Sequence, residues 1–210
     1  MGMKVTRIEE LTKARSKVYI DEEFAFVLYK GELCQYNLVP GEEVQPEDYE
    51  TIMIQVLPKR AKLRVMNLLK NKEYTVKQLR DKLLEGGYPE GVVKEALDYV
   101  AGFHYTDDLR YAVAFITCHE GNRSRRRMEQ DLLGRGIDRD TLEQAWMEWE
   151  EQGGRQDEQA MIRELLEKRG FDPGKADMKE RQRQGAFLMR RGFSGEQIRK
   201  VIFGGEYEDC

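Results

Sequence analysis

The fold of this chain is decided by one short phrase, Leu132-Leu133-Gly134-Arg135-Gly136-Ile137. In this phrase an apolar pair stands four and three residues before a glycine, and another apolar residue follows the glycine at once. The same pattern recurs around Gly87 and Gly192. The three glycines are separated by 49 and 56 residues, which indicates a tandem repeat of helical units.

Each phrase predicts a helix, a short turn and a second helix, because the apolar residues on both sides of the glycine follow the spacing of one helix face. Glycine allows the left-handed backbone that ends many helices. Thr75 with Gln78, and Ser194 with Gln197, have the form of a capping box at a helix start. We therefore expect three helices in each repeat. The helices predicted in the first two repeats cover residues 59–71, 75–86, 90–101, 107–119, 124–134 and 139–151.

The first 58 residues have a different pattern. Two runs rich in β-branched and aromatic residues, at 18–20 and 24–29, are separated by Asp21-Glu22-Glu23 and predict a β-hairpin, and residues 4–11 could supply a third strand. Pro46 suits the first turn of a helix, and Pro58 is expected to stop or kink that helix.

The sequence therefore predicts a mainly α protein. We expect an elongated tandem array of three three-helix repeats that follows a small N-terminal β-hairpin or three-strand extension. The expected domains are the N-terminal extension at 1–58 and the three repeats at 59–106, 107–154 and 155–210. In the third repeat, residues 171–174 mark a longer connection.

Composition limits the class of protein. The chain has 210 residues, 40% of them hydrophobic and 35% charged, and its mean hydropathy is −0.72. This balance favours several small cores over one large core. The three cysteines form no close pair, and no run of 18 apolar residues is present. We expect a monomeric cytoplasmic protein that does not contact membranes, with Cys118 on the inner face of its helix.

Signals of catalysis are missing from the sequence. His104 and His119 are the only histidines, and His119 lacks the second histidine of a zinc-binding helix. There is no phosphate loop of the Walker form, no dinucleotide fingerprint and no paired cysteines at metal-binding spacing. We therefore expect no enzymatic activity, no metal and no cofactor.

Charge is distributed unevenly along the chain. The net charge is −4 overall, which argues against a protein that coats DNA generally, but basic residues cluster at the start of the first repeat, around the start of a helix in the second, and in the third. The basic residues that we consider as contacts to a partner or to DNA are Lys59, Arg60, Lys62, Arg64, Arg123, Arg125, Arg126, Arg127, Arg190 and Arg191.

The cluster at 123–127 is the most unusual of these, because it places cations at a helix N-terminus, where the helix dipole disfavours them. Two interpretations are open. In the first, the arginines form a solvated face paired with Glu120, Glu129 and Asp131. In the second, they contact a phosphate or carboxylate of a partner, for which a helix start flanked by arginines is suited.

A resemblance to a known family rests on a series of motifs in the second repeat. Gly102-Phe103-His104-Tyr105-Thr106-Asp107-Asp108 is followed by Tyr111-Ala112, by Phe115, by the arginine cluster and by the glycine phrase at 132–137. In combination these resemble the central motif of the RecX family, the regulators of the RecA recombinase. The resemblance extends from about residue 59 to residue 203, and the N-terminal hairpin resembles that of the longer members.

The resemblance implies a non-enzymatic modulator that lies in the helical groove of the RecA filament on single-stranded DNA. It would suppress ATP hydrolysis and strand exchange, and so regulate homologous recombination, DNA repair and the SOS response. The partner would be the filament, with only weak affinity for single-stranded DNA alone.

Two other functions stay open at this point. The chain could be a DNA-binding protein that places helix-turn-helix-like pairs, with their basic helix starts, in a groove. The acidic net charge and the absence of one clearly basic recognition helix count against this alternative. It could also be a helical scaffold without a role in nucleic-acid metabolism.

Overall fold

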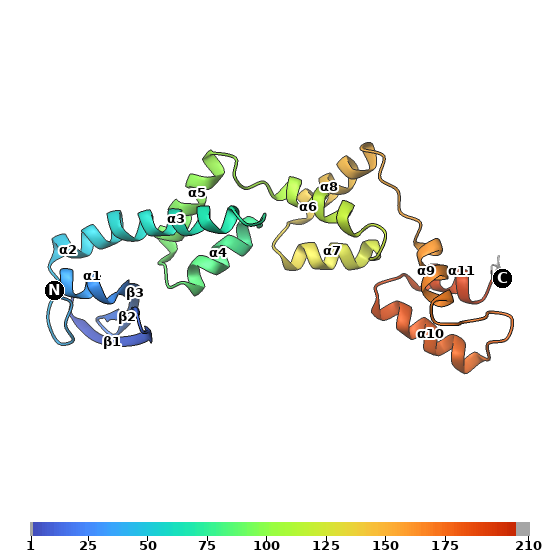
Figure 1. Ribbon diagram of the computed structural model, residues 1–210, viewed down its shortest axis with the longest axis horizontal. Coiled ribbons are helices and arrows are strands. Elements are labelled where there is room, and N and C mark those ends of the chain that lie inside the picture. Colours follow the sequence, from blue (N-terminus) through green and yellow to red (C-terminus); the bar gives the residue numbers. More distant parts are fainter. Residues whose placement is uncertain (1, 205–210) are drawn as a thin grey trace. The chain divides into compact units, whose positions relative to one another are not determined.

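The structure of the protein is a computed structural model that describes residues 2–204 (Figure 1). The chain forms two compact units, Met1–Asp107 and Asp108–Cys210. The first contains a three-stranded sheet and the first helical repeat, and the second contains the other two repeats. The predicted mainly α fold with a small N-terminal sheet is confirmed. No helix in the described part of the chain is long and apolar enough to cross a membrane.

The sheet is antiparallel, with strands β1 (Val5–Thr12), β2 (Arg15–Ile20) and β3 (Glu23–Tyr29) in that order. Asp21 and Glu22 connect β2 to β3 and both have positive φ angles, as a two-residue hairpin turn requires. The predicted hairpin and the third strand are thus confirmed.

The segment after the sheet differs from its prediction at two places. A short helix, α1 (Lys30–Gln35), was not predicted. Helix α2 (Pro46–Thr51) begins at its proline as expected, but the chain then continues through a π-helical turn, η1 (Ile52–Val56), into α3 (Leu57–Leu69). Pro58 therefore does not end the helix. The wider π turn places the irregular hydrogen bonding just before the residue that lacks an N–H.

The first repeat is completed by α4 (Val76–Glu85) and α5 (Glu90–Gly102). It shares one apolar core with the sheet, in which Phe26 packs in the same cluster as Leu79 and Leu83. The turn between the two helices lies against β3: Gly87 has a φ of +81°, and a Cβ there would lie 2.2 Å from Val27 Cγ2. Only glycine fits this close approach.

The second unit repeats the three-helix pattern twice. The second repeat contains α6 (Asp108–His119), α7 (Arg125–Gly134) and α8 (Arg139–Glu151), and the third contains α9 (Glu158–Glu167), α10 (Met178–Arg190) and α11 (Gly195–Ile202). The six helices predicted for the first two repeats are confirmed to within about two residues at each end. Residues 171–174 lie in the non-helical connection between α9 and α10, as predicted.

Each of these repeats has its own apolar core. Leu132 and Trp146 are buried in the second repeat, and Ile162, Leu188 and Ile202 are buried in the third. Separate small cores agree with the expectation from composition.

Two details of the prediction were wrong. Cys118 is exposed rather than part of the core, because the buried Ile116 is two residues earlier and thus faces the opposite side of α6.

The capping box at Ser194 is only half formed: Ser194 Oγ accepts the N–H of Gln197 at 3.2 Å, but Gln197 Oε1 is buried without a partner. At Thr75 both hydrogen bonds of the box are present. Cys210 lies outside the described residues.

Candidate functional site

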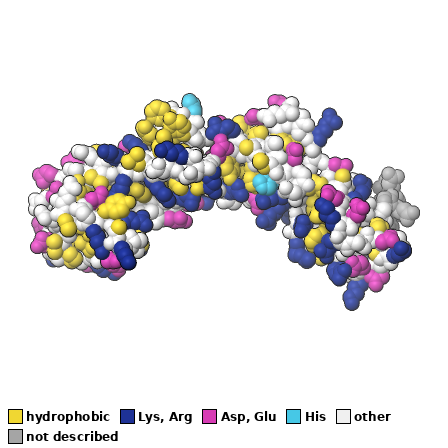
Figure 2. All heavy atoms as spheres, viewed as in Figure 1, with side chains coloured by type: hydrophobic (Ala, Val, Ile, Leu, Met, Phe, Trp, Pro, Cys, Tyr) yellow, Lys and Arg dark blue, Asp and Glu magenta, His cyan; other side chains and the backbone are white. Residues whose placement is uncertain are grey.

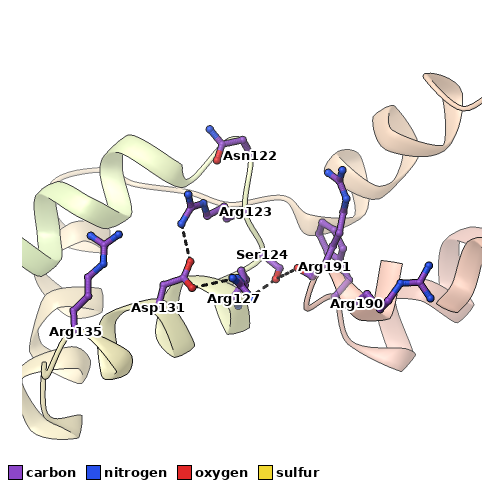
Figure 3. A pocket seen from close by; sticks show the side chains of 9 residues that line it. Asn122, Arg123, Ser124, Arg127, Asp131, Arg135, Arg190 and Arg191 are labelled. Atoms are coloured by element: carbon purple, nitrogen blue, oxygen red, sulfur yellow. Dashed lines mark hydrogen bonds and ion pairs between the residues drawn. The ribbon is translucent and has the colours of Figure 1, made fainter. Parts of the chain in front are cut away.

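A basic cleft in the second unit brings together arginines from the second and third repeats (Figure 3). It has a volume of about 540 Å³. We call it the arginine cleft. Its lining residues are Asn122, Arg123, Ser124, Arg127, Asp131, Arg135, Arg190, Arg191 and Phe193.

The cleft exists because the turn after α10 packs closely on the start of α7. Ser124, the buried N-cap of α7, accepts the N–H of Arg127 at 3.3 Å and donates its hydroxyl to the Arg191 carbonyl at 3.0 Å. Gly192 has a φ of +90°, and a Cβ there would lie only 2.6 Å from Ser124 Oγ. Because Gly192 has no side chain, the turn after α10 can pack against Ser124, and this contact places Arg190 and Arg191 beside α7.

Internal contacts hold several of these guanidinium groups in place. Asp131, whose side chain is 18% exposed, pairs with Arg123 at 2.6 Å and with Arg127 at 3.2 Å. Figure 3 shows this carboxylate between the two arginines. Arg135 hydrogen-bonds the Tyr111 hydroxyl and lies over the Phe115 ring at 4.4 Å.

The charges lining the cleft do not balance. Five arginines and one aspartate line the cleft, so the charged side chains of the lining sum to a formal charge of +4. Guanidinium groups stay charged at any physiological pH and present planar pairs of donors that match phosphate and carboxylate oxygens. The arrangement can therefore bind a polyanionic segment.

The start of α7 is itself already occupied. Glu158 Oε1 accepts the backbone N–H of Arg125 at 2.6 Å, so a carboxylate from the third repeat stands where an anion at the helix start would bind. The anion-binding capacity of this region thus belongs to the arginine side chains rather than to the free N–H groups of the helix.

The remaining arginines of the predicted cluster lie outside the cleft. Arg125 pairs with Glu129 at 3.1 Å and with Glu150 at 3.4 Å. Arg126 is exposed and has no ion pair with any residue that the structure describes. The interpretation as a solvated, paired face therefore describes Arg125, whereas Arg123 and Arg127 combine a pairing with a place in the cleft. Glu120, which that interpretation also included, instead accepts the indole N–H of Trp149 at 2.8 Å.

The basic residues of α3 have mixed environments. Arg60 pairs with Glu32 at 2.8 Å and lies over the Tyr29 ring at 4.6 Å, with its side chain 19% exposed. Lys62 pairs with Glu95 at 2.7 Å. Lys59 and Arg64 are exposed. In Figure 2, basic and acidic side chains are interspersed over the face in view.

Sequence reasoning missed Arg135 as a site residue. It precedes Gly136 as Arg191 precedes Gly192, so the two arginines hold the same position in consecutive repeats. An alignment of the repeats that compared charged as well as apolar positions would have matched Arg135 with Arg191 and so included it among the candidate residues. The first repeat has Gly86 at this position and hence no counterpart.

Two family models match the chain. The first three-helix domain of RecX matches residues 61–99, and the third three-helix domain of RecX matches residues 156–202. The chain is 30% identical over 202 residues to the regulatory protein RecX of Caldanaerobacter subterraneus subsp. tengcongensis, covering 95% of this chain and 98% of that protein. It is 34% identical over 151 residues to that of Chromobacterium violaceum, covering 72% and 94% of the two chains.

Solved structures of similar fold are also found. A crystal structure of regulatory protein RecX aligns with a TM-score of 0.60 at 22% identity, over 96% of this chain and 98% of that chain. A crystal structure of RecX from Lactobacillus salivarius aligns with a TM-score of 0.55 at 18% identity, over 71% and 97% of the two chains. At these identities the likeness concerns the fold.

Proposed function

Because this chain belongs to the RecX family of regulatory proteins, we propose that it binds the RecA filament on single-stranded DNA and inhibits ATP hydrolysis and strand exchange by that filament. The observation that carries the proposal is the arginine cleft, whose surplus of positive charge is held at a fixed place between two repeats. In this proposal the protein acts in the cytoplasm, as a monomer, without chemistry of its own.

A filament on DNA suits these features better than either of its components alone. The net charge of −4 works against tight binding to naked DNA, whose affinity for proteins depends on many neutralised phosphates. A filament on DNA offers protein surface and phosphates repeatedly along its length. Several repeats that contact successive protomers would gain effective affinity from multivalency, even where each contact is weak.

The direct test is the rate of DNA-dependent ATP hydrolysis by RecA on single-stranded DNA as the protein is added. We expect the rate to fall at substoichiometric to equimolar protein, and we expect no hydrolysis by the protein without RecA. An unchanged rate at saturating protein would reject the proposal.

The helix-turn-helix-like alternative has limited support at the start of α7, where Arg126 is the one exposed arginine that forms no ion pair with another described residue. A recognition helix needs side chains near its N-terminus that are free to reach base edges. Arg125 at the start of α7 is paired with two glutamates, and its backbone N–H is taken by Glu158. The arginines of the cleft come from two different repeats rather than from one helix.

A further inference from the structure

Part of the arginine cleft is formed by a loop rather than by a helix. The loop, residues 120–124, connects α6 to α7, and it carries Asn122 and Arg123 into the lining of the cleft (Figure 3). The backbone N–H groups of Asn122 and Arg123 both donate to the His119 carbonyl, at 3.0 Å. These bonds tie the loop to the end of α6. The place of Arg123 in the cleft depends on what else holds the loop.

The side chain of Gln156 holds the loop from outside the cleft. Its Nε2 group donates to the Glu120 carbonyl at 2.9 Å and to the Arg123 carbonyl at 2.6 Å, and it lies 3.6 Å from Met161 Sδ. An amide nitrogen carries two hydrogens, so it can serve two carbonyl groups at once. One half-buried side chain from the segment between α8 and α9 therefore fixes the loop near both of its ends.

The segment that carries Gln156 is itself well held. Before it, the N–H of Gly154 donates to the Trp149 carbonyl at 2.9 Å, at the end of α8. After it, Asp157 is the N-cap of α9 and accepts the N–H of Ala160 at 2.9 Å. Gln156 thus extends from a backbone that is fixed on both sides, and it can transmit that position to the loop.

Arg123 extends from this loop to the other side of the cleft. Its guanidinium pairs with Asp131 at 2.6 Å, and Asp131 also pairs with Arg127 at 3.2 Å. A shift of the loop backbone would draw Arg123 away from this arrangement. Gln156 is not among the residues that line the cleft, so its effect on a bound anion would be exerted through Arg123.

We propose that Gln156 is a positioning residue of the arginine cleft. Through the Glu120 and Arg123 carbonyl groups it holds the Arg123 guanidinium where that group can bind an anionic group of the partner. The assignment of the partner to the RecA filament rests on the proposed function, whereas the positioning of Arg123 by Gln156 stands on the contacts within the second unit.

Hydrogen exchange in the free protein tests the positioning without RecA. Gln156→Met has a similar length and no donor, so exchange of the Arg123 backbone N–H should be faster by about fivefold or more, because two hydrogen bonds that restrain the loop are lost. The matched control is Gln152→Met, since Gln152 is exposed and donates only to the Glu148 side chain, at 3.0 Å. We expect no change at Arg123 in the control.

A third variant separates the hydrogen bonds from the space that the side chain fills. Gln156→Lys keeps N–H donors at a similar reach, so it should retain the slow exchange of Arg123. Equally fast exchange in the Lys and Met variants would assign the effect to packing and overturn the proposal. Unchanged exchange at Arg123 in Gln156→Met would overturn it as well.

Filament binding has a signature that a merely structural role would not produce. Gln156→Met should weaken the affinity by about fivefold, and Arg123→Ala by about tenfold, since Arg123 makes the charge-assisted contact itself. The double variant should bind no more weakly than Arg123→Ala, because Gln156 acts through Arg123. Fluorescence anisotropy with labelled filaments measures the three affinities, and Gln152→Met should bind as the wild type does.

The contrary results are distinct. Losses that add in the double variant would show that Gln156 acts independently of Arg123, which overturns the proposal. Faster exchange at Arg123 with wild-type filament affinity would leave Gln156 as a support of the loop alone, and this also overturns it. A wild-type protein that does not bind the filament rejects the proposed function, while the exchange rates still decide whether Gln156 positions Arg123.

Discussion

The basic residues of α3 and those of the arginine cleft look alike in the sequence but differ in the structure. In α3, Arg60 and Lys62 each pair with a glutamate from another element of the same unit. The cleft is lined by five arginines and one carboxylate, that of Asp131, which pairs with Arg123 and Arg127. The first group is paired within its unit, whereas the second lines a cleft in which arginines outnumber carboxylates.

The difference teaches that a cluster of cations identifies a binding surface only after its carboxylates have been located. Glu32 is 28 residues from Arg60 in the chain, and Arg191 comes beside Ser124 across 67 residues. Both contacts therefore form only in the folded chain and cannot be read from neighbouring residues. The comparison therefore predicts opposite effects for substitutions in the two groups, with binding lost in one and stability lost in the other.

The largest effect is expected from reversing charge in the cleft. Replacing Arg190 and Arg191 by Glu should weaken filament binding about a hundredfold, or ~2.7 kcal/mol, because each lost charge-assisted hydrogen bond is worth about 1.5 kcal/mol or more. Fluorescence anisotropy with labelled filaments measures the affinity. The control replaces Lys94 and Lys168, each paired with a carboxylate four residues away in the chain, by Glu. An equal loss in the control would attribute the effect to total charge rather than to the cleft.

The next effect concerns stability in α3. Arg60→Ala should lower the free energy of unfolding by about 2 kcal/mol, since it leaves Glu32 half-buried without its partner and removes the contact with the Tyr29 ring. Filament affinity should change less than about twofold. Urea denaturation gives the stability, with the exposed Arg64→Ala on the same helix expected within about 0.5 kcal/mol of the wild type. If Arg60→Ala instead abolished filament binding at unchanged stability, α3 would belong to the binding surface.

The smallest effect on stability and binding is expected from a substitution in the turn around Gly192, which packs α10 against α7 at the arginine cleft. Gly192→Ala should cost about 1 kcal/mol or slightly more, because alanine is strained at a φ of +90° and its Cβ would crowd Ser124 Oγ. The displaced turn should also weaken filament binding by several-fold. Gly195→Ala, where a Cβ meets nothing within 4 Å, is the control in thermal unfolding and in binding. Equal behaviour of the two variants would show that the cleft does not depend on this close packing.

Local patterns in the sequence predicted most of the fold. The glycine phrases and their flanking apolar residues located the helices of the repeats, since periodicity and caps are properties of a few neighbouring residues. The hairpin followed from its two apolar runs and the acidic residues between them for the same reason. The six-residue helix α1 was missed because it is short and has no buried residue to give a periodic signal.

The candidate site was predicted less completely, because it is a tertiary arrangement. Four of the ten basic residues chosen from the sequence, Arg123, Arg127, Arg190 and Arg191, line the cleft. The sequence did not predict that α10 brings its arginines to α7, since this depends on the contact of Gly192 with Ser124. It also could not indicate that Glu158 occupies the start of α7.

The central claim is that the protein recognises the assembled filament rather than its DNA, and one measurement tests it directly. The measurement is the affinity of the wild-type protein for the nucleotide-bound RecA filament and for the same single-stranded DNA without RecA, at one physiological salt concentration. We predict that the filament is bound more tightly by about 10²- to 10⁴-fold, because several contacts act together. Equal affinity for filament and naked DNA would contradict the account and favour a DNA-binding protein instead.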